Sequence, residues 1–171
     1  MRKKFKTEDF VIRSFKKGDE ESLQEHINHK SVYRYTLRVP YPYTIKDARE
    51  WIERNMSLDK KKKKDEINLA IEVKGDVVGG IGFIKIEKHK AEIGYWIGKR
   101  LWNKGIMTRA VKLMTKFAFN NLKLRRIYAT INPRNKGSAR VLEKCGYVLE
   151  GRMKKNELKD GVITDSDLYA K

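Results

Sequence analysis

Hydrophobic and polar positions follow two different periods along the chain. Between residues 105 and 121, Ala110, Val111 and Met114 belong to a series of apolar positions at three- and four-residue spacing, which is typical of one face of an amphipathic helix. Between residues 67 and 98, short apolar runs are separated by the turn sequences KGD and EKHK. This second pattern predicts three short strands joined by tight turns.

The N-terminal part of the chain combines a strand signal with two helix signals. Residues 9 to 15 predict a strand, and a helix is expected after Asp19, its plausible N-cap. A second helix is expected from about Ile45 to Ser57. RVPYPYT, between these helices, contains two prolines and predicts an aromatic loop.

The C-terminal part begins with RIYATIN, which predicts a strand. SARVLEKCG predicts a short helix, which Ser138 could cap and Gly146 would terminate. The last segment alternates around the Asp160-Gly161 turn, as expected of a terminal hairpin. The sum predicts a mixed α/β chain.

Two of the predicted strands should be parallel. AEIGYWI is reached by a hairpin and RIYATIN by a helical crossover, and ligands favour the carboxyl ends of strands connected in this way. The WNKG turn at residues 102 to 105 stands at that end, before the long helix. A glycine there lets another molecule approach unpaired N–H groups, which suits an anion such as a pyrophosphate. A plain loop-to-helix turn is the alternative.

Two further motifs are not predicted to bind a ligand. The glycines of GGIG lie within a strand that no helix follows, so they predict close backbone approach or a bulge, and not a dinucleotide site. His26 and His29 are three residues apart on a helix, but no cysteine or carboxylate cluster completes a metal set. No metal site is therefore predicted.

The net charge of the chain limits the classes of molecule that it is expected to bind. The 171 residues include 40 Lys and Arg against 22 Asp and Glu, and the formal charge of +18 is dispersed over the chain. Such a charge attracts polyanions and repels polycationic substrates. The densest run, Lys60 to Lys64, is interpreted as a solvated loop and not as a binding site.

Composition also bears on organisation and location. No Pro-, Gly- or Ser-rich linker divides residues 1–171, so a single domain is expected. Cys145, the single cysteine, permits no internal disulfide, and the charged start MRKKFKTEDF lacks the apolar run of a signal peptide. No stretch approaches the roughly 20 apolar residues that cross a bilayer. A cytoplasmic protein without a membrane partner is expected.

Four sequence blocks occur in the order and spacing of one known family: AEIGYWI, WNKGIMTRAV, NPRNKGSARVLEKCGY and LEGRMKK…DGVITDSDLY. In these blocks the chain resembles the GNAT acetyltransferases, and within them the branch of the ribosomal-protein N-terminal acetyltransferases RimJ and RimL. The resemblance covers nearly the whole chain. It implies an α/β (α+β) GNAT fold: a mixed, mostly antiparallel, twisted sheet flanked by helices, with a parallel strand-helix-strand crossover forming the acetyl-CoA cleft. Acetyl-CoA is the implied cosubstrate.

The family's pyrophosphate loop resembles residues 102–107, and Gly105 matches its central glycine. Trp102 in place of Gln or Arg is familiar in the RimJ and RimL branch, whereas Met107 replaces a small residue and could crowd the phosphates. Because backbone N–H groups do the binding, the loop is still expected to function. By resemblance, the residues expected to bind acetyl-CoA are Trp96, Ile97, Asn103, Lys104, Gly105, Ile106, Met107, Thr108, Asn132, Asn135 and Ser138.

Ser138 is expected to serve the departing sulfur. The matching family segment steers the pantetheine arm through the position of Asn135 and places that of Ser138 near the sulfur, where a hydroxyl can donate to a thiolate. Other branches carry a tyrosine further along this helix as general acid, but this chain has Leu142 there. The alternative is that Ser138 only caps its helix. The two roles do not exclude each other, because a capping hydroxyl can still face the cleft.

Glu92 is the candidate base, because it matches the strand glutamate that acts as base in the histone-acetylating branch. It would act directly or through water; the alternative is a solvent-facing residue paired with a lysine. Glu66 and Glu72, on the neighbouring strand, are weaker candidates. Tyr41 and Tyr43 of the aromatic loop are expected to line the acceptor side, although a packed connection would explain them equally well.

The favoured acceptor is the N-terminal α-amine of a protein or peptide. At pH 7, neutralising an α-amino group costs about 1.4 kcal/mol, against about 4.6 kcal/mol for a lysine, so a weakly placed base suffices. A charge of +18 would repel polyamines and aminoglycosides, whereas the RNA beside a ribosomal N-terminus would attract the protein, so association with ribosomes is considered.

Other readings of the sequence stay open. The acceptor could be a small amine or amino acid, because a fold does not determine a substrate. In a different class, the chain could be a basic ribosome- or RNA-binding module that keeps the fold without the chemistry. Both a monomer and a homodimer are compatible with the sequence.

Overall fold

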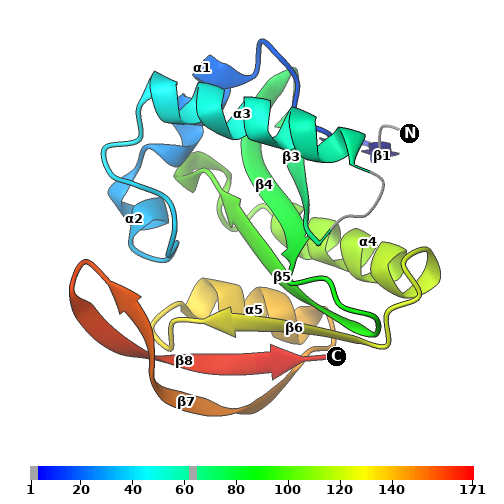
Figure 1. Cartoon of the computed structure of the whole chain (residues 1–171), viewed down its shortest axis with the longest axis vertical. Helices are drawn as coiled ribbons and strands as arrows, with labels where there is room; N and C mark the ends of the chain where they lie inside the picture. The colour runs from blue at the N-terminus through cyan, green and yellow to red at the C-terminus, as the bar shows by residue number, and fades with distance from the viewer. Residues whose placement is uncertain (1–3, 62–64) are drawn as a thin grey trace.

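The computed structural model describes residues 4–61 and 65–171. Its centre is an eight-stranded mixed sheet in the order β1-β2-β3-β4-β5-β6-β8-β7 (Figure 1). The strands are β1 (Lys4–Lys6), β2 (Val11–Arg13), β3 (Ile67–Val73), β4 (Asp76–Ile84), β5 (Lys90–Ile97), β6 (Arg126–Ile131), β7 (Val148–Lys159) and β8 (Val162–Ala170). The predicted mixed, mostly antiparallel sheet is confirmed. Of the run from Lys60 to Lys64, the last three lysines lie outside the described residues.

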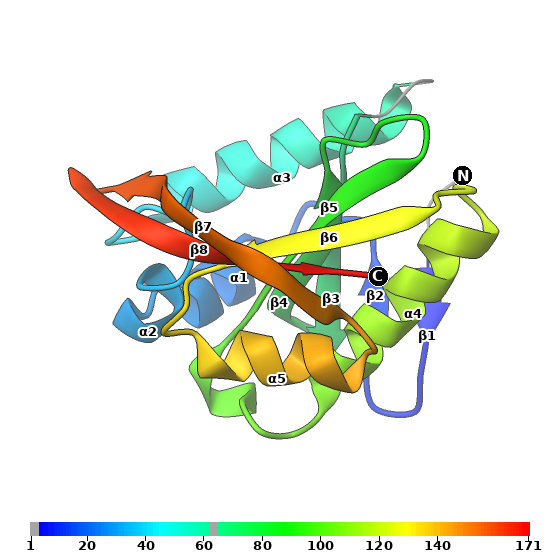
Figure 2. The same cartoon turned by 90° about the horizontal axis from the view of Figure 1, so that it is seen from below.

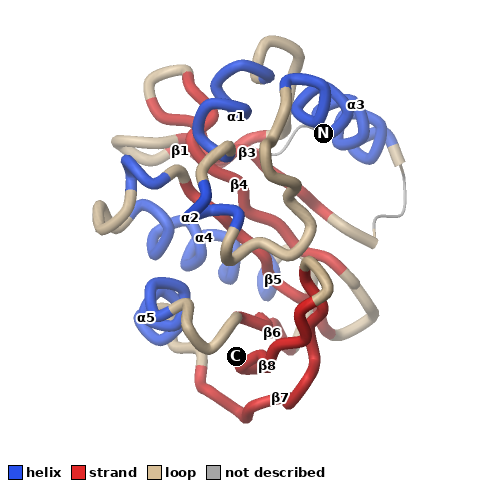
Figure 3. Tube along the Cα trace, turned by 90° about the vertical axis from the view of Figure 1, so that its left-hand side faces the viewer, coloured by secondary structure: helices blue, strands red, loops and turns tan. Residues whose placement is uncertain are grey.

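Helices cover both faces of the sheet (Figure 3). They are α1 (Glu20–Ile27), α2 (Lys30–Tyr33), α3 (Ile45–Lys60), α4 (Ile106–Asn120) and α5 (Lys136–Lys144), with a 3-10 turn η1 (Lys99–Leu101) before α4. The apolar face of α4 and part of α5 pack on one side, where Met114 and Leu142 are fully buried. A second core on the other side joins α1, α2 and α3 to the sheet through Leu23, Val32 and Ile52. None of the helices in the described ranges is long and apolar enough to span a membrane.

The glycines of GGIG allow close packing within the meander of β3, β4 and β5. A Cβ at Gly82 would stand 2.1 Å from the carbonyl oxygen of Ile67, and one at Gly80 would stand 2.6 Å from the indole nitrogen of Trp96. The β3–β4 register also shifts between Ile71 and Glu72. Of the two alternatives predicted for these glycines, close backbone approach is confirmed, and the bulge lies just before them, at Val78.

The parallel strands β5 and β6 separate soon after they meet. They pair at Lys90 with Arg126, at Ala91 with Ile127 and at Glu92 with Tyr128. Along its other edge β6 pairs with β8, from Tyr128 to Ile131, and β8 crosses beneath β6 in Figure 2. After Glu92, β5 stays paired with β4 on one edge, but its main-chain groups on the β6 side face an opening in the sheet.

Helix termini differ from the expectations in three places. Asp19 occupies the N-cap position of α1 but makes no capping bond, because its carboxylate binds Arg13 at 2.7 Å and the backbone N–H of Lys16 at 2.9 Å. Asn135, and not Ser138, caps α5 by accepting a bond from the N–H of Ser138. The helix expected to end near Ser57 continues to Lys60 from a capping box of Thr44 and Asp47.

The terminal hairpin has the predicted turn. Asp160 and Gly161, with φ of 51° and 76°, both adopt the left-handed conformation between β7 and β8, as a two-residue hairpin turn requires. This hairpin extends to the side of the molecule on which α2 and the following loop lie (Figure 1).

Candidate active site

The turn before α4 has the geometry of an anion site. Asn103 and Gly105 have φ of 60° and 72°, and a Cβ at Gly105 would meet nothing within 4 Å. The first helical bond of this turn runs from Arg109 to the carbonyl of Gly105, so the N–H groups of Ile106 to Thr108 precede it. Left-handed residues followed by free N–H groups form a concavity that binds anions.

The side chains around this turn separate into inner and outer positions. Ile106 and Met107 are 5% and 6% exposed and belong to the core, so the Met107 side chain packs inward and does not project from the turn. Lys104 is exposed. Trp102 donates from its indole nitrogen to the carbonyl of Ile97 at 2.9 Å, which ties the turn to the end of β5.

Three of the expected cofactor residues, Trp96, Thr108 and Asn132, make contacts with other parts of the chain. Trp96 packs against the core cluster of α1 to α3, on the face of β5 opposite to Tyr95 and Ile97, because side chains alternate along a strand. The carbonyl of Thr108 accepts a bond from the Cys145 thiol at 3.4 Å. Asn132 accepts from the N–H of Arg134 at 2.9 Å, which shapes the turn before α5.

Ser138 lies at the start of α5 and faces the opening between β5 and β6. Its hydroxyl is 2.8 Å from the hydroxyl of Tyr95, and Asn135 accepts from its N–H at 3.1 Å. Leu142, at the position where other branches have tyrosine, is fully buried. The Asn135 side chain therefore caps the helix through the N–H of Ser138, which leaves the Ser138 hydroxyl to contact Tyr95.

Glu92 stands at the last parallel pair of β5 and β6. One carboxylate oxygen accepts from Thr130 at 2.7 Å and the other from the Lys85 ammonium at 2.8 Å. The expected lysine partner is present, but the residue is only 8% exposed and does not face solvent. Both oxygens have a donor, and Thr130 joins Glu92 to β6 where the strands part.

The weaker carboxylate candidates are held in other ion pairs. Glu66 accepts from Arg54, including one bond of 2.8 Å, and this hydrogen bonding lowers the pKa of Glu66. Glu72 binds Arg13, near the opposite end of β3. Glu66 also borders the larger cavity that contains Glu92, but its oxygens are bound to Arg54, whereas Glu72 borders neither cavity.

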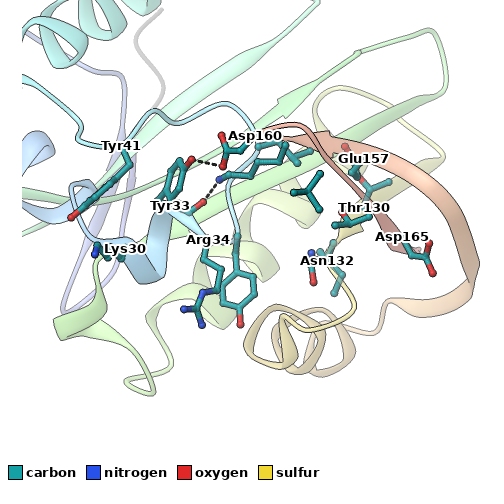
Figure 4. Close-up of a pocket in the computed structure, with 15 residues that line it drawn as sticks. Lys30, Tyr33, Arg34, Tyr41, Thr130, Asn132, Glu157, Asp160 and Asp165 are labelled. Atoms are coloured by element: carbon teal, nitrogen blue, oxygen red, sulfur yellow. Dashed lines mark hydrogen bonds between the residues drawn. The ribbon is translucent and has the colours of Figure 1, made fainter.

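Two cavities meet beside Glu92. A cavity of about 1040 Å³ contains Glu92, Tyr95, Asn135 and Ser138 in its walls. A second pocket of about 440 Å³ lies between α2, the following loop and the β7–β8 hairpin (Figure 4). Residues common to both walls are Tyr35, Leu37, Thr130, Ile131 and Glu157, so the two spaces are neighbours.

The smaller pocket is closed by contacts between distant segments. The Lys159 ammonium donates to the carbonyls of Tyr33 and Thr36, the latter at 2.6 Å, and lies 3.6 Å from the centre of the Tyr33 ring. The Tyr33 hydroxyl in turn donates to Asp160 (Figure 4). We call these contacts of Lys159 and Asp160 with residues 33–36 the hairpin clasp.

The two tyrosines expected on the acceptor side point to different surroundings. Tyr41 is 41% exposed and lines the smaller pocket beside Tyr33, their ring centres 5.5 Å apart. Tyr43 is 5% exposed and belongs to the core around α1 and α3, although it also borders the larger cavity. Burial raises the pKa of Tyr43.

Glu157 is a site residue that the sequence reasoning missed. It lies opposite Thr164 in the hairpin and borders both cavities. Burial raises its pKa, and the negative charge of Glu92 raises it further. The period-two alternation of β7 and β8 could have placed Glu157 and Thr164 on one face, but only folding brings that face to Glu92.

Among residues 4–61 and 65–171, no group of three or more His, Cys, Asp or Glu side chains is placed to hold a metal ion.

Relatives of the chain include named N-acetyltransferases. The probable N-acetyltransferase YjcK of Bacillus subtilis is 38% identical over 139 residues, which cover 78% of this chain and 76% of that protein. The L-amino acid N-acetyltransferase AaaT of Escherichia coli is 28% identical over 167 residues, covering 95% of this chain and 98% of that protein.

Solved structures have the same fold. The ribosomal-protein-S5-alanine acetyltransferase of Vibrio fischeri superposes with a TM-score of 0.85 at 25% identity, covering 99% of this chain and 96% of that one. The microcin C7 self-immunity acetyltransferase MccE, solved with acetyl-CoA and AMP, also has a TM-score of 0.85 at 25% identity, with coverage of 96% and 93%. Residues 9–148 match the acetyltransferase (GNAT) domain. The chain belongs to the GNAT acetyltransferase family and is an acyltransferase that uses acetyl-CoA.

Proposed function

We propose that the chain acetylates the N-terminal α-amine of a protein or peptide, as a ribosomal-protein acetyltransferase does. The observation that carries this proposal is the position of Glu157. This carboxylate has a raised pKa and borders both the cavity that contains Ser138 and the pocket beneath the hairpin clasp. An acceptor chain that enters through the smaller pocket would bring its amine to Glu157.

The donor side fits acetyl-CoA on several observations. The free N–H groups after Gly105 and the exposed Lys104 suit a pyrophosphate. The main-chain groups of β5 after Glu92 have no strand partner on the side of β6, so they can bind the amides of an extended arm, with Asn135 and Ser138 across the opening. Acetyl-CoA bound there would supply an activated acetyl thioester.

Glu157 is the better candidate for the base, with Glu92 as a fixed charge beside it. A base near neutral pH works best with a pKa close to that of its medium, and burial moves Glu157 in that direction. Glu92 has a donor on each oxygen, which leaves it less able to take a proton directly. It supports catalysis through its charge, or through water as the sequence suggested.

The choice of an α-amine follows from the strength of this base. An α-amino group loses its proton about two pH units below a lysine side chain, so a carboxylate with a moderately raised pKa is sufficient. Tyr41 and Leu37 at the smaller pocket give an acceptor peptide apolar contacts. The similarity to the S5-alanine acetyltransferase supports the same class of acceptor.

Location and association are parts of the same proposal. The formal charge of +18 supports association with ribosomes through RNA. A cytoplasmic location is supported by the absence of a possible internal disulfide. Residues 1–171 are taken as one domain, supported by the sheet that joins β1 to β8.

An amino acid acceptor is the second candidate, because the similarity to AaaT covers nearly the whole chain. A small amine would fill only part of the two neighbouring cavities. The basic binding module without chemistry is not favoured, since the chain belongs to a family of enzymes.

The test is acetyl-CoA consumption, followed as released thiol, with N-terminal peptides, free amino acids, spermidine and an aminoglycoside as acceptors. We expect turnover with peptides, and mass spectrometry should locate the acetyl group on the α-amine. Turnover with free amino acids alone would replace the proposal by the second candidate. Turnover with spermidine or the aminoglycoside alone would contradict the charge argument.

A further inference from the structure

The hydroxyl of Tyr95 contacts the serine expected to serve the departing sulfur. Tyr95 is on β5, where it faces α5, and its hydroxyl lies 2.8 Å from the Ser138 hydroxyl and 3.3 Å from the Ser138 carbonyl oxygen. Burial raises the pKa of Tyr95. The phenol therefore keeps its proton throughout the neutral range and is available as a hydrogen-bond donor.

Each of the two hydroxyls, of Tyr95 and of Ser138, can donate one hydrogen bond. The carbonyl oxygen of Ser138 can only accept, so Tyr95 donates either to that carbonyl or to the Ser138 hydroxyl oxygen. The second arrangement has the shorter separation, 2.8 Å against 3.3 Å. When Tyr95 donates to the hydroxyl oxygen, the serine proton is free to point away from Tyr95, toward the cavity that both residues line.

We propose that Tyr95 is a positioning residue that orients the Ser138 hydroxyl so that its proton points at the departing sulfur. Leu142, at the position where other branches have tyrosine, is buried and supplies no hydroxyl. Tyr95 acts only through Ser138 and does not touch the reacting atoms. The inference rests on the proposed function and on the role of Ser138 that the family resemblance implies.

Acetyl transfer can be written with every bond and proton accounted for, and Tyr95 keeps its proton throughout. The amine nitrogen bonds to the acetyl carbon, and the carbon–sulfur bond breaks with its electron pair on sulfur. Glu157 accepts the amine proton and passes it to solvent, and solvent returns one proton to the released thiolate. Ser138 donates a hydrogen bond to the sulfur while its charge develops, and Tyr95 donates to Ser138.

The experiment is a double-mutant cycle on kcat with Tyr95→Phe, Ser138→Ala and the double variant, using the best acceptor peptide. We expect Tyr95→Phe to lower kcat about fivefold to tenfold and to leave KM for acetyl-CoA within about twofold. Ser138→Ala should lower kcat at least as much. The double variant should match Ser138→Ala within about twofold, because the phenol has nothing left to orient.

Tyr147→Phe is the matched control. The Tyr147 hydroxyl is also 2.8 Å from a side-chain hydroxyl, that of the buried Thr115, but Tyr147 lines neither cavity. Both phenylalanine variants lose a similar buried bond, so a similar fall in Tm is expected. Only Tyr95→Phe should lower kcat.

The outcomes separate this inference from the proposed function. An unchanged kcat in Tyr95→Phe overturns the role of Tyr95 while leaving acetyl transfer intact. Equal losses from Tyr95→Phe in the wild-type and Ser138→Ala backgrounds also overturn it, since Tyr95 would then act independently. A Ser138→Ala variant with full activity would refute the serine role itself, and an inactive wild type with every amine would refute the proposed function.

Discussion

The proposed donor and acceptor sides of the cavity are built in different ways. The donor side consists of consecutive residues: the Gly105 turn with the N-terminus of α4, and the Asn135 cap with Ser138. The acceptor side joins residues 33–36 to Lys159 and Asp160 through contacts more than 120 positions apart. A short turn positions backbone groups by its own geometry, whereas the acceptor pocket exists only when two distant segments meet. The acceptor side is therefore the part in which substrate choice can vary without loss of the cofactor site.

The largest effect is expected for Glu157→Gln. A glutamine cannot accept the amine proton, so kcat/KM should fall about 100-fold or more. The raised pKa of Glu157 also means that kcat/KM of the wild type rises with pH through a value above that of an ordinary glutamate, because the protonated acid cannot act as base. The variant should lose this acidic limb. Glu87→Gln, at an exposed turn residue, is the control, and an unaltered pH profile in Glu157→Gln would contradict the assignment.

On the donor side, Gly105→Ala should raise KM for acetyl-CoA about tenfold. Gly105 has φ of 72°, a conformation that costs an L-residue about 1 to 2 kcal/mol. KM for the peptide should stay within about twofold. Gly75→Ala provides the same strain, at φ of 97° with open space around its Cβ, in the β3–β4 turn. If both variants changed KM for acetyl-CoA equally, the Gly105 turn would not be a cofactor site.

On the acceptor side, Lys159→Met should raise KM for the peptide about fivefold and spare KM for acetyl-CoA. The methionine keeps the apolar stem but leaves the carbonyls of Tyr33 and Thr36 without the ammonium, so the hairpin clasp loosens. Lys154→Met on the same strand serves as control, since Lys154 is exposed. If KM rose for acetyl-CoA and not for the peptide, the hairpin clasp would belong to the cofactor site and not to the acceptor site.

The smallest effect is expected for Glu92→Gln, with a fall in kcat/KM of less than about tenfold. The Thr130 bond can persist with an amide oxygen, but the negative charge that raises the pKa of Glu157 disappears. The acidic limb of the pH profile should therefore move to lower pH. A loss as large as that of Glu157→Gln, with no such movement, would return the role of base to Glu92.

Sequence patterns predicted the helices, strands and turns because these elements depend on residues that are close together in the chain. Apolar spacing located α4, tight turns delimited β3 to β5, and Asp160-Gly161 marked the terminal hairpin. The errors concern side chains with several possible partners. Asp19 and Ser138 both stand where a cap is common, but Arg13 binds the first and Tyr95 the second. A propensity cannot report which distant group will compete for a polar side chain.

The sequence by itself determined the chain's family, its strand-helix-strand crossover and the glycine turn of the donor side, because each depends on neighbouring residues. Only the tertiary structure decided which carboxylates share the cavity. Glu92 and Glu157 come together because β6 lies between β5 and β8, and β8 pairs with β7, which carries Glu157. The pKa of Glu157 and the closure of the acceptor pocket follow from that long-range pairing, through burial and charge that no short stretch of sequence specifies.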